Sequence, residues 1–322
     1  MTLLHLCSSH QPIIGLLTPH LPYSLSTLQP LTTPGSPLTL YSTLDPTSTA
    51  ASDDDGWIVL VDLGNQLRFY HSFEKRILGE PNDGAGTGQK KELIEKGEEL
   101  VERVIRDFLT NHQEGREVMK IGSISDVWSK AIERATGIPA EGETRPPRYR
   151  IWFDPSIRDT TGRPSPEKGD VEVDRTAAPE GMEFREAKEE DIAIFLSTSE
   201  VAHSPSYLSS RLPYTSVLIS SSSRTIISHA TTHRDGSLGT LFVSPSHRRK
   251  GLAKLVSQHR LSEQARESDG RGGRGHSHVR RDNESSRACM RSLGWEESTW
   301  SVWWGIIGID EWRERERQKD GY

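Results

Sequence analysis

The most informative segment of this chain is Ser237-Leu-Gly-Thr-Leu-Phe-Val-Ser-Pro-Ser-His-Arg-Arg-Lys-Gly-Leu-Ala253. It opens with a short apolar run typical of a strand, and Pro245 ends that run because proline lacks the backbone N–H that a sheet uses. Further along, apolar residues recur at helical spacing. The segment therefore predicts a strand, a turn and a helix that begins at a basic cluster. The apolar positions of that helix are Leu252, Leu255, Val256 and Leu261.

The first turn of this predicted helix has the features of a phosphate site. A helix N-terminus presents unpaired N–H groups and the positive end of the helix dipole, and both attract phosphate. Arg248, Arg249 and Lys250 add charge, Gly251 keeps a side chain out of the way of a ligand, and Ala253 is small. The pattern is Arg-x-x-Gly-x-Ala. Taken alone, the pattern is a weak signal, because basic residues before a helix are common on solvated surfaces.

A second segment, Val279 to Trp295, predicts a strand, a cap at Asp282 or Asn283 and a short helix that ends at Gly294. Together the two segments resemble the acyl-CoA-binding core of the GCN5-related N-acetyltransferase (GNAT) superfamily, over roughly residues 181 to 305. Three shorter motifs are similar to its glycine N-acyltransferase and FR47-like branch. They are Arg211-Leu-Pro-Tyr214, Ser228-His229 and Asp235-Gly-Ser-Leu-Gly-Thr-Leu-Phe-Val243.

The resemblance implies an α+β (α/β mixed sheet) protein, with the acyl-CoA N-acyltransferase (GNAT) fold in its C-terminal half. The expected organisation is a smaller, glycine N-acyltransferase-like α/β domain over residues 1–154, a linker or loop over 155–180, and the GNAT domain over 181–322. The first domain is also open to interpretation as a degenerate GNAT-like half. Strand-like segments at 56–62 and 66–71 and a helical stripe over 91–112 predict core positions in it, and none of them indicates chemistry.

The resemblance also implies acetyl-CoA or another acyl-CoA as co-substrate, and no metal. A backbone N–H near the end of the strand at Phe242 and Val243 is expected to polarise the thioester oxygen. The candidate cofactor-binding residues are Leu241, Phe242, Val243, Arg248, Arg249, Lys250, Gly251, Leu252, Ala253, Asn283 and Ser286.

The chain departs from the family at two catalytic positions. Ser237 stands where glycine N-acyltransferases carry a catalytic Glu, and Met290 stands where the family often has a Tyr that serves as general acid. The remaining candidate bases are His233, Asp235 and His229. Each also has a structural interpretation: His233 in a solvated turn, Asp235-Gly236 as a turn signal, and His229 as a core histidine on the face of Ile227 and Thr231. Asn283 is likewise either a helix cap or a cofactor contact.

Three functions remain open at this stage. The first is an N-acyltransferase that transfers an acyl group from acyl-CoA to a primary amine of a small molecule or amino acid by direct attack. The second is a catalytically idle acyl-CoA-binding sensor or interaction module, which Ser237 and Met290 favour. The third is a protein N-acetyltransferase with an acceptor groove between the halves.

Composition restricts the partners. A length of 322 residues allows two domains, and 33% hydrophobic residues with 27 Gly and 18 Pro predict long loops, at residues 79–89 and 154–179. The net charge of -6 argues against nucleic-acid binding, and the basic stretch 266–281 has no aromatic residue for base stacking.

The same data predict where the protein works. Two cysteines, Cys7 and Cys289, fit a reducing compartment, and no apolar run approaches the ~20 residues that cross a bilayer. We therefore expect a cytoplasmic protein without a membrane partner. A mitochondrial location stays open although no presequence is seen, and the oligomeric state is not predicted.

Overall fold

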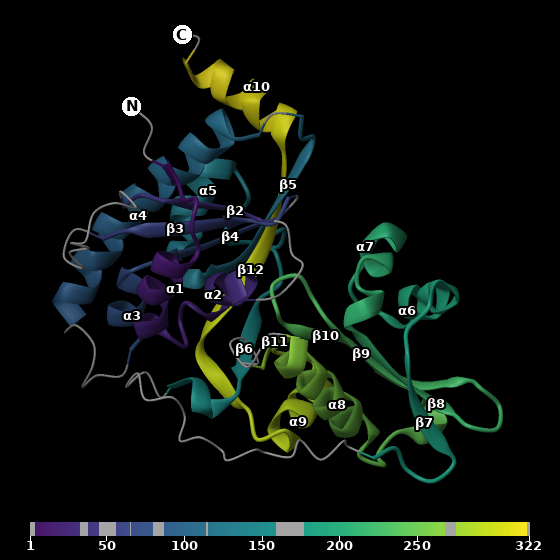
Figure 1. The fold of residues 1–322 in the computed structure, drawn as a ribbon. Helices are drawn as coiled ribbons and strands as arrows, with labels where there is room; N and C mark the ends of the chain where they lie inside the picture. Colours follow the sequence, from purple (N-terminus) through teal and green to yellow (C-terminus); the bar gives the residue numbers. More distant parts are fainter. Residues whose placement is uncertain are drawn as a thin grey trace. The chain divides into compact units, whose positions relative to one another are not determined.

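The computed structural model describes residues 4–32, 38–44, 56–64, 66–79, 87–113, 115–158, 177–267 and 275–320 (Figure 1). Residues 80–86 of the predicted loop 79–89, most of the predicted linker 155–180 and the centre of the basic stretch 266–281 lie outside these residues. The last three residues of that predicted loop, 87–89, are helical and begin α4 (Thr87–Asn111). The chain divides into two compact units. The first comprises residues 1–31, 35–150 and 298–322, and the second comprises residues 32–34 and 151–297.

The first unit is built on strands that continue in space in the order β1-β2-β3-β4-β5-β12. Its strands are β1 (His5–Leu6), β2 (Thr39–Ser42), β3 (Ile58–Asp62), β4 (Gln66–His71) and β5 (Val118–Ser125), with β12 (Glu296–Gly308) entering from the C-terminal part. Its helices are α1 (Gln11–Leu17), α2 (Leu25–Thr32), α3 (Phe73–Leu78), α4 (Thr87–Asn111), α5 (Ser129–Thr136) and α10 (Ile309–Asp320), with 3-10 turns at Thr18–His20 and Asp126–Trp128.

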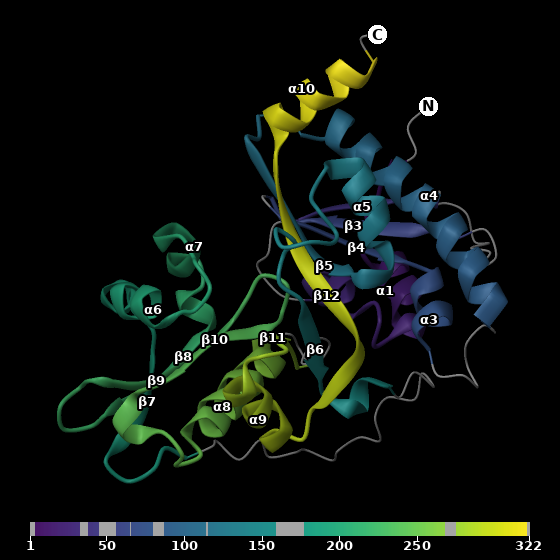
Figure 2. The same cartoon turned by 180° about the vertical axis from the view of Figure 1, so that it is seen from behind.

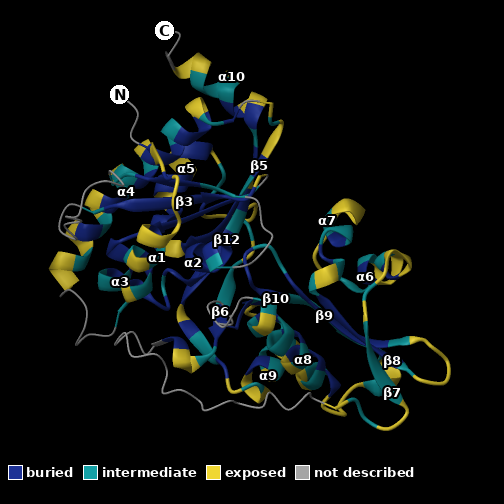
Figure 3. Ribbon diagram, in the orientation of Figure 1, coloured by how far each residue is buried: buried dark blue, intermediate teal, exposed yellow. Residues whose placement is uncertain are grey.

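Helices cover both faces of this first sheet, with α4 and α5 on one face and α1 and α2 on the other (Figures 1 and 2). Strand β3 is buried along its whole length, in keeping with the apolar run from Ile58 to Val61 that precedes Asp62 (Figure 3). β4 and β5 are parallel, and α4 forms the crossover connection that parallel neighbours require. Among the described residues, the register partners of this pair are Gln66 with Lys120 and Leu67 with Ile121.

The second unit contains an antiparallel sheet in the order β10-β9-β8-β7, while β11 lies beside β6. The strands are β6 (Tyr149–Phe153), β7 (Met182–Glu186), β8 (Thr215–Ser220), β9 (Ile226–Thr232), β10 (Leu238–Val243) and β11 (His276–Arg280). The helices are α6 (Ile192–Thr198), α7 (Pro205–Ser209), α8 (Leu252–Glu267) and α9 (Glu284–Ser292), with 3-10 turns at Pro155–Arg158, Glu189–Asp191, Leu212–Tyr214 and Pro245–His247.

Two separate apolar layers hold the second unit together. On one face of the sheet, α8 and α9 pack over a core that includes Ala230, Val256 and Met290. On the other face, α6 and α7 pack over Val217 and Ile219. The strand–turn–helix order and the short capped helix predicted from the sequence are confirmed as β10, α8 and α9.

One detail of the sheet differs from the sequence prediction. Alternation predicts that Ile227 shares the face of His229, but Ile227 packs with Leu252 of α8, whereas His229 contacts the α6 side. The reason is a register shift in β9, where Ile219 pairs with Ile226 and Leu218 pairs with Ser228. The extra residue turns Ile227 to the opposite face.

The two units share one succession of elements: a strand, two helices, three strands, a helix, a strand, a short helix and a strand. In the first unit this is β1-α1-α2-β2-β3-β4-α4-β5-α5-β6, and in the second it is β7-α6-α7-β8-β9-β10-α8-β11-α9-β12. The repeat supports the interpretation of the N-terminal half as a second copy of the same fold, with α3 inserted after β4.

The last strand of each repeat lies with the other unit. β12 pairs antiparallel with β5 of the first unit, and residues 151–153 of β6 belong to the second unit beside β11. The compact units therefore differ from the contiguous ranges 1–154, 155–180 and 181–322. As limits along the sequence, those ranges stay a prediction.

Candidate functional site

The candidate site lies in the second unit, where β10 and β11 separate into different sheets. β10 carries a bulge: Gly239 pairs with Thr231 and Phe242 pairs with His229, so two residues of β10 face one of β9. Thr240, at the bulge, has a φ of 47°. Among the described residues its buried hydroxyl oxygen has no hydrogen-bond partner. A non-glycine residue in this conformation and an orphaned polar atom are typical of functional sites.

The basic turn that follows β10 leads directly into α8, as predicted. Gly251 has a φ of 78° and its carbonyl accepts the first helical hydrogen bond, from Leu255 N at 3.0 Å. A Cβ at Gly251 would meet no atom within 4 Å, so the space before the helix is open to a ligand. Arg249 and Lys250 are exposed. Arg248 is exposed too, but its Nε donates to the carbonyl of Val243 at 3.2 Å and so fixes the turn to the end of β10.

Asn283 is the cap of α9: its Oδ1 accepts from Ser286 N at 2.9 Å. Its Nδ2 donates to Glu200 at 3.3 Å, in the segment between α6 and α7. The structural interpretation of Asn283 is thus confirmed, and its contact with a cofactor stays a prediction. Met290 is buried in the apolar core below α9, which removes its thioether from any site.

His229 has the surroundings of a core histidine. It is fully buried between Phe195 and Phe242, and its Nε2 lies 3.1 Å from Oγ1 of Thr198. Burial lowers the pKa of His229 to about 4. It is therefore uncharged near neutral pH and a weak base. These contacts favour its structural interpretation.

His233 lies in a different environment, at the end of β9. Its ring packs against Gly239 of β10, and its Nδ1 lies 2.7 Å from the hydroxyl of Tyr207 on α7. His203 stacks beside the same tyrosine. Burial, and secondarily the charge of Asp235, raise the pKa of Tyr207 to about 12, so the phenol keeps its proton. An imidazole and a phenol thus meet beside the bulge.

Asp235 is buried in the turn between β9 and β10. Its Oδ1 accepts from the backbone N of Ser237 at 3.1 Å and from the Ser237 hydroxyl at 2.6 Å. Gln264 of α8 also donates to the carbonyl of Gly236 at 3.1 Å. Ser237, at the family's glutamate position, is therefore part of the turn's own hydrogen bonding.

Sequence reasoning missed Thr240, Tyr207, His203 and Glu200. The left-handed conformation of Thr240 follows from a bulge that no residue type announces. The other three come from the α6–α7 region, and they reach the site only through the packing of those helices on the sheet. Pro205 after Ser204 was a helix-start signal, but it says nothing about what the helix contacts.

The family model described as FR47-like protein matches residues 218–304, from β8 to β12. This part of the chain is therefore similar to the FR47-like branch of the GNAT superfamily. The match spans the bulged strand, the basic turn and α9, which are the features that carried the resemblance in the sequence.

The chain is also similar to solved structures, and two of the three described next cover nearly its whole length. A Drosophila protein solved by a structural genomics consortium is 13% identical, covers 95% of this chain and 98% of its own, and has a TM-score of 0.55. A tandem GNAT protein from the clavulanic acid biosynthesis pathway is 14% identical over 95% and 98%, with a TM-score of 0.41. A putative GNAT acetyltransferase of Novosphingobium aromaticivorans is 12% identical over 63% and 79%, with a TM-score of 0.39. No curated protein has a matching sequence.

The mixed α+β class and the GNAT fold expected from the sequence are thus confirmed. Of the helices in the described ranges, none combines the length and apolar character that crossing a bilayer requires.

Proposed function

We propose that the second unit is an acyl-CoA-dependent N-acyltransferase, acting with acetyl-CoA or another short acyl-CoA on a primary amine of a small molecule or amino acid. One observation carries this proposal: strand β10 lies against His233 of the His233–Tyr207 pair at Gly239, carries the bulge at Thr240 and ends just before the open helix N-terminus of α8. An acyl-CoA needs both a proton-transfer pair near its thioester and a phosphate site for its pyrophosphate.

Cofactor binding is assigned to the turn Arg248–Gly251 and the first residues of α8. The pyrophosphate accepts from the free N–H groups of the helix N-terminus, and Arg249 and Lys250 supply positive charge. The pantetheine arm then extends between β10 and β11. Because β10 is an edge strand there, its outer backbone groups are turned away from β9.

In the reaction the amine nitrogen attacks the thioester carbonyl carbon, the C–S bond breaks, and coenzyme A leaves as the thiolate. A backbone N–H at the bulge of β10, near Thr240, stabilises the oxyanion. His233 takes the ammonium proton through Nε2 when its Nδ1 donates to Tyr207, and the second proton of the attacking nitrogen passes to solvent as the intermediate collapses. Tyr207, neutral because of its raised pKa, gives its proton to the departing thiolate and regains one from the His233 imidazolium. This assigns the acid and base roles to residues other than Met290 and Ser237.

A catalytically idle acyl-CoA-binding sensor or interaction module is the second candidate. It is favoured by the two positions where the family has catalytic residues: Ser237 donates a hydrogen bond to Asp235, and Met290 lies in the core. Such a protein would keep the phosphate turn and lose turnover.

The test combines calorimetric titration of acetyl-CoA with a thiol-release assay over a panel of primary amines. We expect wild type to bind acetyl-CoA and release thiol with at least one amine. Gly251→Glu places a carboxylate against the phosphate and should weaken binding at least about 100-fold. Gly251→Ala is the matched control, because it has the same backbone strain without the charge.

Binding by wild type without thiol release for any amine would support the sensor instead. If wild type does not bind acetyl-CoA, or if Gly251→Glu binds as well as Gly251→Ala, the assigned cofactor site is wrong.

A further inference from the structure

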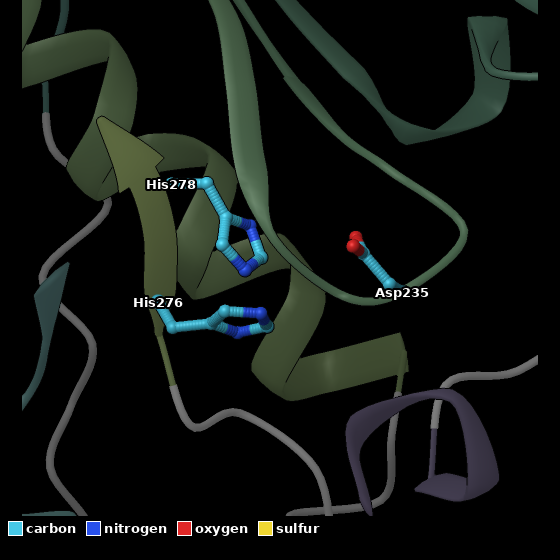
Figure 4. Close-up of side chains that lie close together, drawn as sticks. All are labelled: Asp235, His276 and His278. Carbon is cyan, nitrogen blue, oxygen red and sulfur yellow. The ribbon is translucent and has the colours of Figure 1, made fainter. Parts of the chain in front are cut away.

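Three side chains of types that bind metals lie close together in the second unit, and none of them belongs to the proposed acid–base pair. Asp235 comes from the turn between β9 and β10, and His276 and His278 come from β11 (Figure 4). One ligand atom of each lies within 4.8 Å of the others. We propose that Asp235, His276 and His278 bind a divalent transition-metal ion of the Zn²⁺ type. The proposal does not depend on the acyltransfer activity.

The backbone explains why the two histidines act together. They are two residues apart in a strand, so both project from the same side of β11, toward the turn that carries Asp235 (Figure 4). Between them, Ser277 points the other way and its hydroxyl donates to the carbonyl of Leu238 at 2.8 Å. This bond fixes β11 against the start of β10, and so it fixes the distance between the histidines and Asp235.

The donor set fits the chemistry of the ion. Two imidazoles and one carboxylate are ligands that Zn²⁺ takes, and with three protein ligands a fourth position is left for water. Bonds of about 2.0–2.2 Å in a tetrahedral site put the ligand atoms roughly 3.4 Å apart. The observed spacing therefore closes with small side-chain rotations. The carboxylate charge also offsets part of the charge of a divalent cation.

The surroundings have two further properties expected of a metal site: an oriented carboxylate ligand and a path of entry for the ion. The carboxylate of Asp235 is oriented by the two hydrogen bonds from Ser237, as ligating carboxylates usually are by their outer neighbours. Asp235 and His276 are buried, whereas His278 is partly exposed and gives the ion a path of entry. An ion here would tie the β9–β10 turn to β11 where the two sheets diverge.

The experiment uses the full chain, freed of metal by a chelator and dialysed. Zn²⁺ affinity is measured by competition with a chromophoric chelator, metal content by mass spectrometry and stability by the Tm. We expect one zinc per chain and a Tm that rises with added Zn²⁺. Co²⁺ should give the visible absorption of a tetrahedral site. His278→Ala should lower zinc affinity at least about 100-fold.

Two variants separate metal binding from folding. Asp235→Asn keeps an oxygen that can accept from Ser237, so it preserves the turn and should still lose affinity. His247→Ala removes a histidine of the same unit that bonds to Ser244, and it should bind zinc as wild type does. Failure of wild type to bind, unchanged affinity in His278→Ala, or loss in His247→Ala would each overturn the site. All of these readouts are taken without acyl-CoA.

Discussion

At the scale of single residues, the contact between His233 and Tyr207 decides how the proposed reaction handles protons. The two side chains come from β9's end and from α7, and they lie 2.7 Å apart at the hydrogen-bonding atoms. Neither is a buried core residue like His229, because both are only partly covered. The pair thus combines a fixed geometry with access to a substrate.

Replacing His233 by Ala should lower kcat about 100- to 1000-fold, because a general base contributes on that order. Tyr207→Phe should lower kcat less, since water can protonate the thiolate. Both variants should retain the calorimetric Kd of wild type for acetyl-CoA. His259→Ala, a histidine stacked on Phe184 in the same unit, is the control and should keep wild-type kcat. Wild-type kcat in His233→Ala would remove it as the base.

Several single residues could be predicted from the sequence, because their roles are set locally. Gly251 follows a basic cluster and precedes a helix, and Asn283 directly precedes a short helix, so neighbouring residues in the sequence predict the turn and the cap. The role of Tyr207 could not be predicted in this way. Its partner His233 is 26 positions away, and they meet only when α7 packs on the sheet.

At the scale of elements, the first unit contains a buried pair of titratable groups where β4 runs into α3. Oε1 of Glu74 accepts from the indole N–H of Trp128 on the turn before α5, at 2.9 Å, and from the backbone N of His71 at 3.3 Å. Burial raises the pKa of Glu74 to about 8 and lowers that of His71 to about 3. Both groups are therefore neutral in the folded protein near pH 7.

These two altered pKa values predict a stability optimum. Unfolded Glu74 loses its proton above about 4.5 but the folded group keeps it to about 8, so stability falls as pH rises through that window. His71 acts in the opposite direction: the unfolded group gains a proton below 6.5, so stability falls as pH drops from there toward 3. A pKa that differs by one between the folded and unfolded states corresponds to about 1.4 kcal/mol in the free energy of unfolding.

Glu74→Gln should therefore stabilise the protein at pH 8 relative to wild type and have little effect at pH 4.5, since glutamine keeps an acceptor for Trp128 without ionising. Urea unfolding at the two pH values measures the difference. Glu99→Gln, on the exposed side of α4, is the control and should change neither value. A Glu74→Gln effect that is equal at both pH values would contradict the buried-acid interpretation.

Elements with strong periodicity were predicted well. The long stripe expected at residues 91–112 is α4, and the two strands expected around 56–71 are β3 and β4. The register shift that turns Ile227 away from His229 could not be predicted, because a bulge depends on cross-strand partners rather than on the alternation of residues within one strand.

At the scale of the whole molecule, the repeated fold raises the question of how many cofactors one chain binds. In the first unit, the space where β4 and β5 separate is filled. The guanidinium of Arg68 lies against Gly122 of β5, where only a residue without Cβ leaves room, and the indole of Trp304 covers the same glycine. These side chains occupy space that a pantetheine arm would need between the two strands.

We therefore expect one acetyl-CoA per chain in calorimetry, despite the two copies of the fold. Gly251→Glu should abolish the whole titration rather than half of it. Arg68→Ala, with the cofactor site of the second unit intact, serves as the comparison and should keep a stoichiometry of one with the wild-type Kd. A stoichiometry of two, or binding that survives in Gly251→Glu, would show a second site in the first unit.

The placement of β12 beside β5 also sets an order of events in the making of the protein. Trp303, Ile307 and Trp312 are buried in the core of the first unit, although they follow the second unit in the sequence. While the ribosome is still translating the second unit, the sheet of the first unit has an uncovered edge at β5 and a core without these side chains. The N-terminal unit can therefore complete its core only after the second unit has been synthesised. Most of the second repeat has been translated before the first unit can finish folding.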